Sequence, residues 1–189
     1  MPWADAVAVT LEIASALAHC HERTGADGAP LGIVHRDLSP QNVMVGFSGD
    51  VKLIDFGTAR GDNRRCHTVS GTVLAKPGYV APEVARGDSA TPRADVYALG
   101  VMLWELACGR RFLEGDPAEH VAAITQGRLR PAKLSGDPVL AQLGDGPVPA
   151  ELDRIVEWLT EPIGSARCGR AREAAQALAG LLSSAPRRP

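Results

Sequence analysis

The sequence has 189 residues, of which 45% are hydrophobic, and a formal net charge of −2. This length can bury one good core, and nothing in the sequence argues for two domains. The composition lacks the basic excess that would indicate a nucleic-acid or membrane-surface partner, so we expect neither.

Four cysteines are spread through the chain: Cys20, Cys66, Cys108 and Cys168. They form no C-x-x-C pair, which argues against a zinc site or a disulfide framework and favours reduced thiols. The longest apolar run, residues 96–107, contains Glu105 and is too short to span a membrane. The N-terminus also lacks the pattern of a signal peptide. We therefore expect a cytoplasmic protein.

The chain begins with an alanine-rich run, residues 5–22, that is apolar around much of its helical surface. This pattern predicts a buried helix. Thr91 and Pro92 have the residue types that begin a helix, and Gly109 has the type that ends one. The residues between them are apolar on nearly every face, which predicts the central buried helix of the domain.

The C-terminal part is expected to hold a short helix at residues 116–126, and then a Gly- and Pro-rich loop at residues 127–149 where a substrate could dock. Two further sets of apolar residues have helical spacing: Leu152, Ile155, Val156 and Leu159, and then Ala174, Leu178 and Leu181. We expect the domain to occupy residues 1–182 and residues 183–189 to form a disordered tail.

The stretch from His35 to Asn42 lies between two apolar segments and is predicted to be a loop. Asp37 is its only carboxylate, Asn42 follows five residues later, and Pro40 keeps the loop from forming a helix. The loop therefore holds a proton acceptor and a neutral oxygen ligand for Mg²⁺ apart on a stiffened backbone. Phosphoryl transfer to a hydroxyl requires such groups, because it depends mostly on positioning and charge neutralisation.

A β-hairpin is predicted directly after this loop. Residues 43–45 and 51–54 are β-prone, and the turn-rich residues 46–50 join them. In a hairpin that closes near Ser48, residues equidistant from the turn lie about 5 Å apart, which would bring Asn42 and Asp55 together. One carboxylate and one amide oxygen suit Mg²⁺, whose remaining ligands come from water and substrate phosphates.

Four motifs then occur in a characteristic order: His35-Arg36-Asp37 with Asn42, Asp55-Phe56-Gly57, Ala81-Pro82-Glu83, and the segment that starts at Asp95. With them the sequence resembles the large lobe of the serine/threonine protein kinases, over roughly residues 4–182. The resemblance implies an α+β, mainly helical fold: a kinase-like C-lobe with a small β-hairpin region and no N-lobe.

The resemblance also implies roles and cofactors. Asp37, Asn42 and Asp55 would be the catalytic residues; Asp37 would act on the substrate hydroxyl, and Asn42 and Asp55 would hold the Mg²⁺ bound to ATP. Met44 would form the floor of the adenine site. The partners would be ATP and a protein substrate that is phosphorylated on serine or threonine.

Residues 58–80 resemble the activation segment of kinases, which orders when a phosphate pairs with arginines. Arg36 would receive that phosphate. The candidate phosphorylation sites are Thr68, Ser70 and Thr72, and the sequence leaves open which of them is used. The segment departs from the family just before Tyr79, where Lys76-Pro77-Gly78 replaces the usual threonine-containing peptide.

Two further contacts are implied by the resemblance. Asp95 would accept hydrogen bonds from the backbone of the His35-Arg36 turn; the alternative is an acid that only favours a helix N-terminus. Glu83 would pair with an arginine before the last helix. Counting residues favours Arg167 and leaves Arg170 as the alternative.

The sequence contains no glycine-rich loop, strand lysine or helix glutamate of a kinase small lobe, and Ser39 replaces the lysine that often follows the catalytic aspartate. Three hypotheses therefore compete. The first is a protein kinase whose small lobe is encoded separately or on a mis-started frame. The second is a kinase-like binding module without activity, and the retention of Asp37, Asn42 and Asp55 counts against it. The third is a small-molecule phosphotransferase, which Arg36 and the segment at residues 81–83 disfavour.

Overall fold

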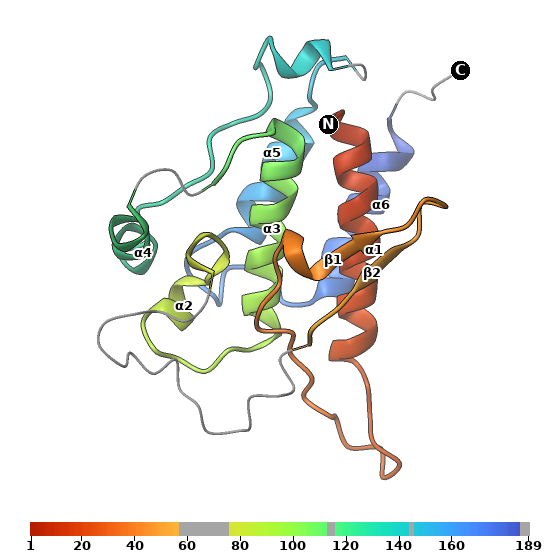
Figure 1. Cartoon of the computed structure of the whole chain (residues 1–189), viewed down its shortest axis with the longest axis vertical. Coiled ribbons are helices and arrows are strands. Elements are labelled where there is room, and N and C mark those ends of the chain that lie inside the picture. The colour runs from red at the N-terminus through yellow and green to blue at the C-terminus, as the bar shows by residue number, and fades with distance from the viewer. Residues whose placement is uncertain (57–75, 113–115, 144–145, 186–189) are drawn as a thin grey trace.

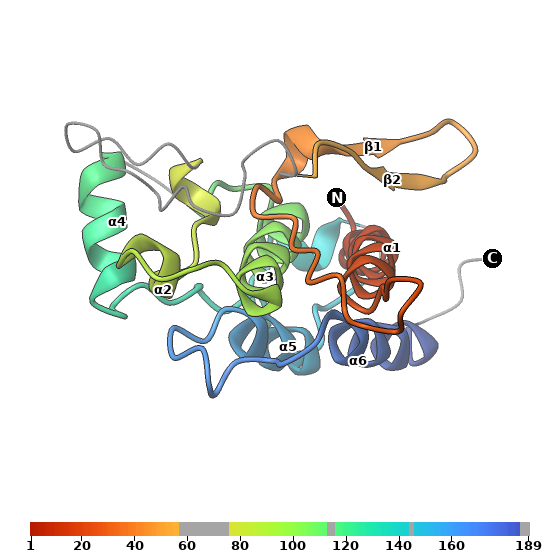
Figure 2. The same cartoon turned by 90° about the horizontal axis from the view of Figure 1, so that it is seen from below.

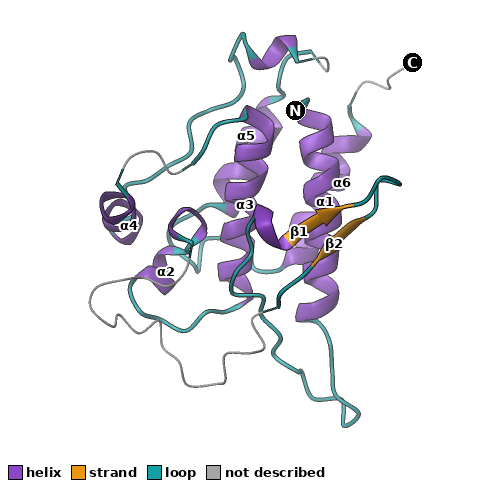
Figure 3. Ribbon diagram, viewed as in Figure 1, coloured by secondary structure: helices purple, strands orange, loops and turns teal. Residues whose placement is uncertain are grey.

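The computed structural model describes residues 1–56, 76–112, 116–143 and 146–185 (Figure 1). The α-helices are α1 (Trp3–His21), α2 (Pro82–Ala85), α3 (Pro92–Cys108), α4 (Pro117–Thr125), α5 (Ala150–Leu159) and α6 (Ala171–Ser183). The strands are β1 (Val43–Val45) and β2 (Val51–Leu53), and the short 3-10 helices are η1 (Pro40–Asn42), η3 (Pro77–Tyr79) and η4 (Leu140–Gln142). Within the described residues the fold is mainly helical with one small sheet, which confirms the expected fold class (Figure 3).

Helices α1 and α3 form the middle of the domain (Figure 2). Helix α3 is buried along nearly its whole length, and Val96, Leu99 and Leu103 have no exposed surface. It begins after Thr91 and ends at Gly109, whose φ of 70° is the left-handed conformation typical of a helix C-terminus. The sequence predicted this helix, its limits and its burial correctly.

The hairpin lies on one side of α1 and α3, and α5 and α6 lie on the opposite side (Figure 2). Helix α5 buries Leu152, Ile155, Val156 and Leu159, which are the residues whose spacing predicted it. Helix α6 runs to Ser183, one residue into the expected tail, and residues 186–189 of that tail lie outside the described part of the chain. Helices α1 and α3 thus lie between two layers: the hairpin and its preceding loop on one side, and α5 and α6 on the other.

The hairpin pairs β1 with β2 in an antiparallel register, with Val43 opposite Leu53 and Val45 opposite Val51. Continuing this register places Asn42 opposite Ile54, and the Ile54 N–H donates to the Asn42 carbonyl at 3.0 Å. The predicted pairing of Asn42 with Asp55 is therefore wrong by one residue, because the turn is centred on Ser48 itself. Asp55 still follows directly at the open end of the hairpin.

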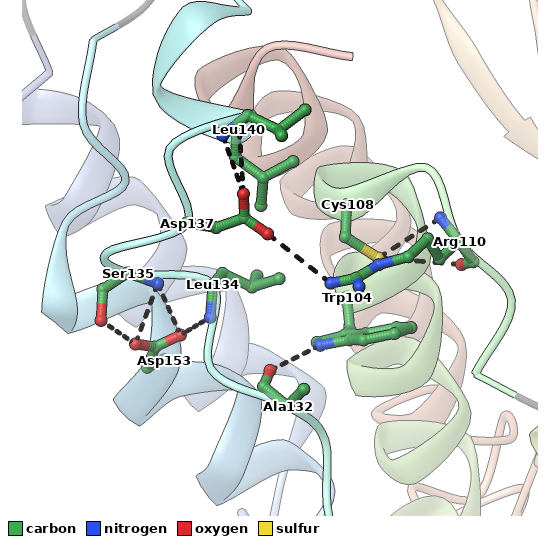
Figure 4. Close-up of polar contacts among 10 residues, drawn as sticks. Trp104, Cys108, Arg110, Ala132, Leu134, Ser135, Asp137, Leu140 and Asp153 are labelled. Carbon is green, nitrogen blue, oxygen red and sulfur yellow. Dashed lines mark hydrogen bonds and ion pairs between the residues drawn. The ribbon is translucent and has the colours of Figure 1, made fainter.

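The segment between α4 and α5 is fastened to the helices by side chains (Figure 4). Asp153 of α5 accepts a hydrogen bond from the Leu134 N–H at 2.7 Å, and Leu134 is fully buried. The Trp104 indole N–H of α3 donates to the Ala132 carbonyl at 2.8 Å, and Arg110 and Asp137 approach to 3.8 Å. Residues 132–137 are thus part of the packed domain. Substrate docking at this segment stays a prediction.

None of the described helices is both long enough and apolar enough to cross a membrane. Cys20, Cys108 and Cys168 are free thiols, and Cys66 lies outside the described residues.

Gly100 gives a test of how closely α3 and α5 pack. A Cβ atom added at Gly100 would lie 2.6 Å from the Leu159 Cβ and 2.8 Å from the Thr160 Cγ2. We expect Gly100→Ala to lower the free energy of unfolding by about 1–3 kcal/mol in urea melts, because the helices must move apart. The control is Gly180→Ala on the exposed side of α6, where nothing lies within 4 Å of an added Cβ. Gly180→Ala should leave the free energy of unfolding unchanged or raise it by up to about 1 kcal/mol, since alanine favours a helix. Equal effects of the two substitutions would contradict the close approach.

Candidate active site

The loop at residues 35–42 is anchored by Asp95 in the first turn of α3. One carboxylate oxygen of Asp95 accepts the His35 N–H at 2.8 Å, and the other accepts the Arg36 N–H at 2.9 Å. His21, at the end of α1, places its Nε2 2.8 Å from the same carboxylate, and Asp95 is only 2% exposed. The contact of Asp95 with the His35-Arg36 turn is the one that the resemblance implied. Asp95 therefore ties α1, α3 and the loop together.

The anchor holds a backbone conformation that is otherwise unfavourable. Arg36 has a φ of 69°, in the left-handed region that arginine rarely adopts. Such a residue costs free energy of order 1–3 kcal/mol and persists only where its surroundings fix it. The hydrogen bonds from Asp95 to His35 and Arg36 supply that constraint. The Arg36 side chain is exposed. Its role in binding a phosphate of the activation segment stays a prediction.

His35 joins the loop to the hairpin. Its side chain is fully buried, and its Nε2 donates to the Ile54 carbonyl at 3.1 Å. Its ring also lies 4.6 Å from the ring of Phe56. Since Asn42 pairs with Ile54 as well, the loop and the strand that leads to Asp55 are connected on both sides.

Asp37 and Asn42 are held together at the end of the loop. The Asn42 amide group donates to the Asp37 backbone carbonyl at 2.7 Å and to its carboxylate at 3.0 Å. Asn42 is 5% exposed, whereas the Asp37 side chain is 43% exposed. The buried amide thus fixes the orientation of a carboxylate that faces solvent, where a substrate hydroxyl could reach it.

The residues predicted to hold Mg²⁺ are compatible with that ion. Both hydrogen bonds of Asn42 to Asp37 use its amide nitrogen, so they leave its amide oxygen available as a ligand. Asp55 is exposed and has a φ of 56°, a strained conformation that is typical of functional sites. The described residues contain no group of three His, Cys, Asp or Glu side chains that could hold a metal by themselves. An amide and a carboxylate completed by phosphates are the ligands expected for Mg²⁺.

Met44, the predicted floor of the adenine site, is 58% exposed on β1. Its neighbour Val45 is 60% exposed. The exposed Met44 side chain is apolar, as the floor of an adenine site would be, and this role stays a prediction. Four predicted residues, Gly57, Thr68, Ser70 and Thr72, lie outside the described part of the chain.

Lys76 also lies in the site, and reasoning from the sequence did not identify it as a site residue. Its ammonium group donates to the Ser39 hydroxyl at 2.7 Å and lies 3.5 Å from the Asp37 carboxylate. Arg36, Asp37 and Lys76 line a pocket together with Val80 and Val84. Both Ser39 and Lys76 depart from the family pattern, and the two departures together were the signal that could have indicated this contact.

The segment that carries Lys76 is fastened to α3 through Tyr79. The Tyr79 hydroxyl donates to Glu105 at 2.6 Å, and Arg111 donates to the same hydroxyl at 3.0 Å. Glu105 also accepts the Phe112 N–H at 2.8 Å. Burial, together with the neighbouring Glu105 carboxylate, raises the pKa of Tyr79 well above its usual value, so the phenol stays protonated and donates this bond at neutral pH.

Glu83 and Arg167 form a bidentate ion pair. The two guanidinium nitrogens lie 2.7 and 2.9 Å from the two carboxylate oxygens. The Arg167 side chain is fully buried and also donates to the carbonyls of Arg93 and Glu161. Its guanidinium carbon lies 5.0 Å from the centre of the Tyr97 ring. The structure thus selects Arg167 over the alternative, Arg170.

The comparisons with known proteins agree with this geometry. The family model described as protein kinase domain matches residues 1–179. The tyrosine-protein kinase MasK of Myxococcus xanthus is 41% identical over 126 residues, which are 66% of this chain and 20% of that protein. The probable serine/threonine-protein kinase PknB of Lactococcus lactis is 40% identical over 118 residues, which are 62% of this chain and 18% of that protein.

A third relative covers more of the chain. The serine/threonine-protein kinase PknL of Mycobacterium tuberculosis is 35% identical over 161 residues, which are 85% of this chain and 36% of that protein. The chain belongs to the protein kinase family. It spans between about a fifth and about a third of the length of these relatives.

The Glu83–Arg167 pair should contribute strongly to stability. We expect Glu83→Gln and Arg167→Met each to lower the free energy of unfolding by about 3–5 kcal/mol, because each leaves a buried polar group without its partner. In urea melts the free energy of unfolding of the double variant should fall by much less than the sum of the two single losses, since the interaction can be lost only once. Additive losses below about 1 kcal/mol would mean that both charges are solvated and contribute little.

The same pair makes stability depend on pH. Burial by itself would raise the pKa of Glu83, but the hydrogen bonds and the charge of Arg167 outweigh burial and hold the pKa below the ordinary value of 4.5. A lowered carboxylate pKa stabilises the folded state above the ordinary value, and this contribution is lost as the pH falls through the folded value. The stability difference between the wild type and Glu83→Gln should therefore be constant near neutral pH and shrink below about pH 4.5. Urea melts at a series of pH values measure it; a difference that grows on acidification would contradict the pair.

Proposed function

We propose that this chain is the catalytic large lobe of a protein kinase that transfers the γ-phosphate of ATP to serine or threonine hydroxyls of a protein. One observation carries the proposal. The Asp37 carboxylate is exposed to solvent while the buried Asn42 amide holds it in place, and Asp95 fixes the turn that precedes it. The positioned carboxylate is what the attacking hydroxyl needs.

Each of the three site residues would have a separate role in the reaction. Asp37 would orient the substrate hydroxyl and accept its proton. Asn42 would keep Asp37 in place through its amide nitrogen and offer its amide oxygen to Mg²⁺. Asp55 would offer its carboxylate to the same ion. When bound, Mg²⁺ and ATP supply the phosphoryl group and neutralise the charge on its oxygens.

The groups that cover the phosphates in kinases would come from a small lobe outside the present sequence, either on the same protein or on a separate chain. The apolar surface of Met44 supports this idea, because an adenine ring needs a second apolar wall opposite it. We place the reaction in the cytoplasm, where ATP is available.

Serine and threonine are favoured as acceptors by the Pro40-Gln41-Asn42 ending of the loop and by the names of two of the relatives, although another relative is named a tyrosine kinase. A binding module without activity would not need the Asp37–Asn42 arrangement. The retained geometry therefore favours the enzyme over the kinase-like scaffold.

The test uses the chain joined to the small lobe of a related kinase, or the whole protein that contains it. Asp37→Asn should lower kcat by about 10²–10⁴-fold with nucleotide binding nearly intact, because only the proton acceptor is lost. Asp55→Ala should also lose Mg²⁺-dependent nucleotide binding. Phosphate transfer to a protein substrate and calorimetric binding of Mg-ATP measure the two effects.

The control is Glu157→Gln on the exposed side of α5, which should leave both quantities unchanged. Substantial activity in Asp37→Asn would show that Asp37 is not the residue that orients the hydroxyl. Phosphoamino-acid analysis of the product would decide between serine, threonine and tyrosine as acceptors.

A further inference from the structure

Two departures of this sequence from the kinase pattern meet in the structure. Ser39 occupies the position at which many serine/threonine kinases carry a lysine, and Lys76 occupies part of the peptide in which they carry a threonine. The two residues are 37 positions apart, yet the Lys76 ammonium group donates to the Ser39 hydroxyl at 2.7 Å. It also lies 3.5 Å from the Asp37 carboxylate. A cation is thus present beside Asp37, but it comes from a different segment of the chain.

We propose that Lys76 is a catalytic residue that supplies the positive charge to the transferring phosphoryl group, in place of the lysine that Ser39 replaces. The inference rests on the proposed function and adds a specific residue to it. A positive charge that is already aimed at the reacting oxygens stabilises charge that develops in the transition state without reorganisation. Lysine suits this task, because its ammonium group is a compact charge on a flexible stem.

The position of Lys76 supports contact with a ligand as well as with the protein. Its side chain is 37% exposed, and Ser39 is fully buried beneath it. The contact with Ser39 thus leaves part of the Lys76 side chain accessible to solvent, next to the partly exposed Asp37 carboxylate. An ammonium group has three donors, and the Ser39 hydroxyl takes one of them.

The alternative is that Lys76 only fastens its own segment to the loop. That segment already has other anchors, because Tyr79 is bonded to Glu105 at 2.6 Å and Glu83 is paired with Arg167. Lys76 is therefore not required to keep residues 77–83 in place. A partly exposed lysine beside the proposed proton acceptor, in a segment that has other anchors, therefore fits a role toward the transferring phosphoryl group.

The reaction balances with Lys76 protonated throughout. A bond forms between the substrate hydroxyl oxygen and the γ-phosphorus, and the bond from that phosphorus to the bridging oxygen of ADP breaks. The hydroxyl proton passes to the Asp37 carboxylate, and ADP leaves with the bonding electron pair. Lys76 neither gains nor loses a proton, and it neutralises charge on the oxygens of the phosphoryl group during transfer.

The test measures phosphate transfer by the chain joined to a related small lobe. We expect Lys76→Met to lower kcat by about 10- to 1,000-fold, the cost of removing one group that stabilises transition-state charge, with little change in the KM for ATP. Lys133→Met, which removes an exposed lysine outside the site, is the matched control and should leave kcat unchanged. Ser39→Lys added to Lys76→Met should restore most of the lost kcat, because it returns the cation to the catalytic loop.

The second measurement does not need turnover. The chain has three lysines, Lys52, Lys76 and Lys133, so acetylation of each amine can be followed by mass spectrometry with the other two as internal references. A non-hydrolysable ATP analogue with Mg²⁺ should slow acetylation of Lys76 relative to Lys52 and Lys133. Lack of protection at saturating nucleotide, or normal kcat in Lys76→Met, would overturn the inference.

The two proposals fail in different ways. If Asp37→Asn is inactive and Lys76→Met is normal, the kinase function stands and only the role of Lys76 is wrong. If Lys76→Met is impaired and the double variant with Ser39→Lys is folded but not rescued, Lys76 acts on the structure of its segment and the inference is also wrong. If the protein neither binds nucleotide nor transfers phosphate, the proposed function fails and the role of Lys76 falls with it.

Discussion

The buried carboxylate of Asp95 is the interaction on which the site depends. It accepts two backbone hydrogen bonds from the His35-Arg36 turn and contacts His21, so it links α1, α3 and the loop. A buried carboxylate is stable only when its oxygens are satisfied in this way. The turn in its strained conformation then directs the buried His35 ring onto the Ile54 carbonyl, which fixes the strand that ends at Asp55. The positions of both proposed catalytic carboxylates thus follow from one residue of α3.

The first turn of α3 also fixes the other side of the site. The Arg93 carbonyl, two residues before Asp95, accepts a hydrogen bond from Arg167, and that guanidinium holds Glu83. Because Glu83 lies in the first turn of α2, the segment before it is brought against the same helix end that anchors the catalytic loop. A single rigid helix therefore positions two segments that are far apart in the sequence. This arrangement keeps their relative placement independent of the surrounding loops.

Periodicity and capping residues predicted the helices well, because burial of α3 and α5 follows directly from their apolar spacing. Motif order predicted the partners of Asp95 and Glu83, since those contacts are shared by the family. Counting residues favoured Arg167 but left Arg170 open, because the choice depends on how residues 161–170 turn. It also misplaced the partner of Asn42 by one residue. The contact of Lys76 with Ser39 was missed, because the only signal was that both residues depart from the family pattern, and it is the fold that brings them together.

The placement of Lys76 has a consequence for how such a site would be controlled. A lysine on the catalytic loop would be held by Asp95 at all times, whereas Lys76 reaches Asp37 only when its own segment is docked. Docking depends on the bond from Tyr79 to Glu105 and on the pairing of Glu83 with Arg167. If Lys76 supplies the charge for transfer, these two anchors become conditions for catalysis as well as for stability. Displacing the segment would then remove the cation and leave Asp37 and its hydrogen bonds to Asn42 in place. The catalytic loop would keep its structure, but phosphate transfer would be slow.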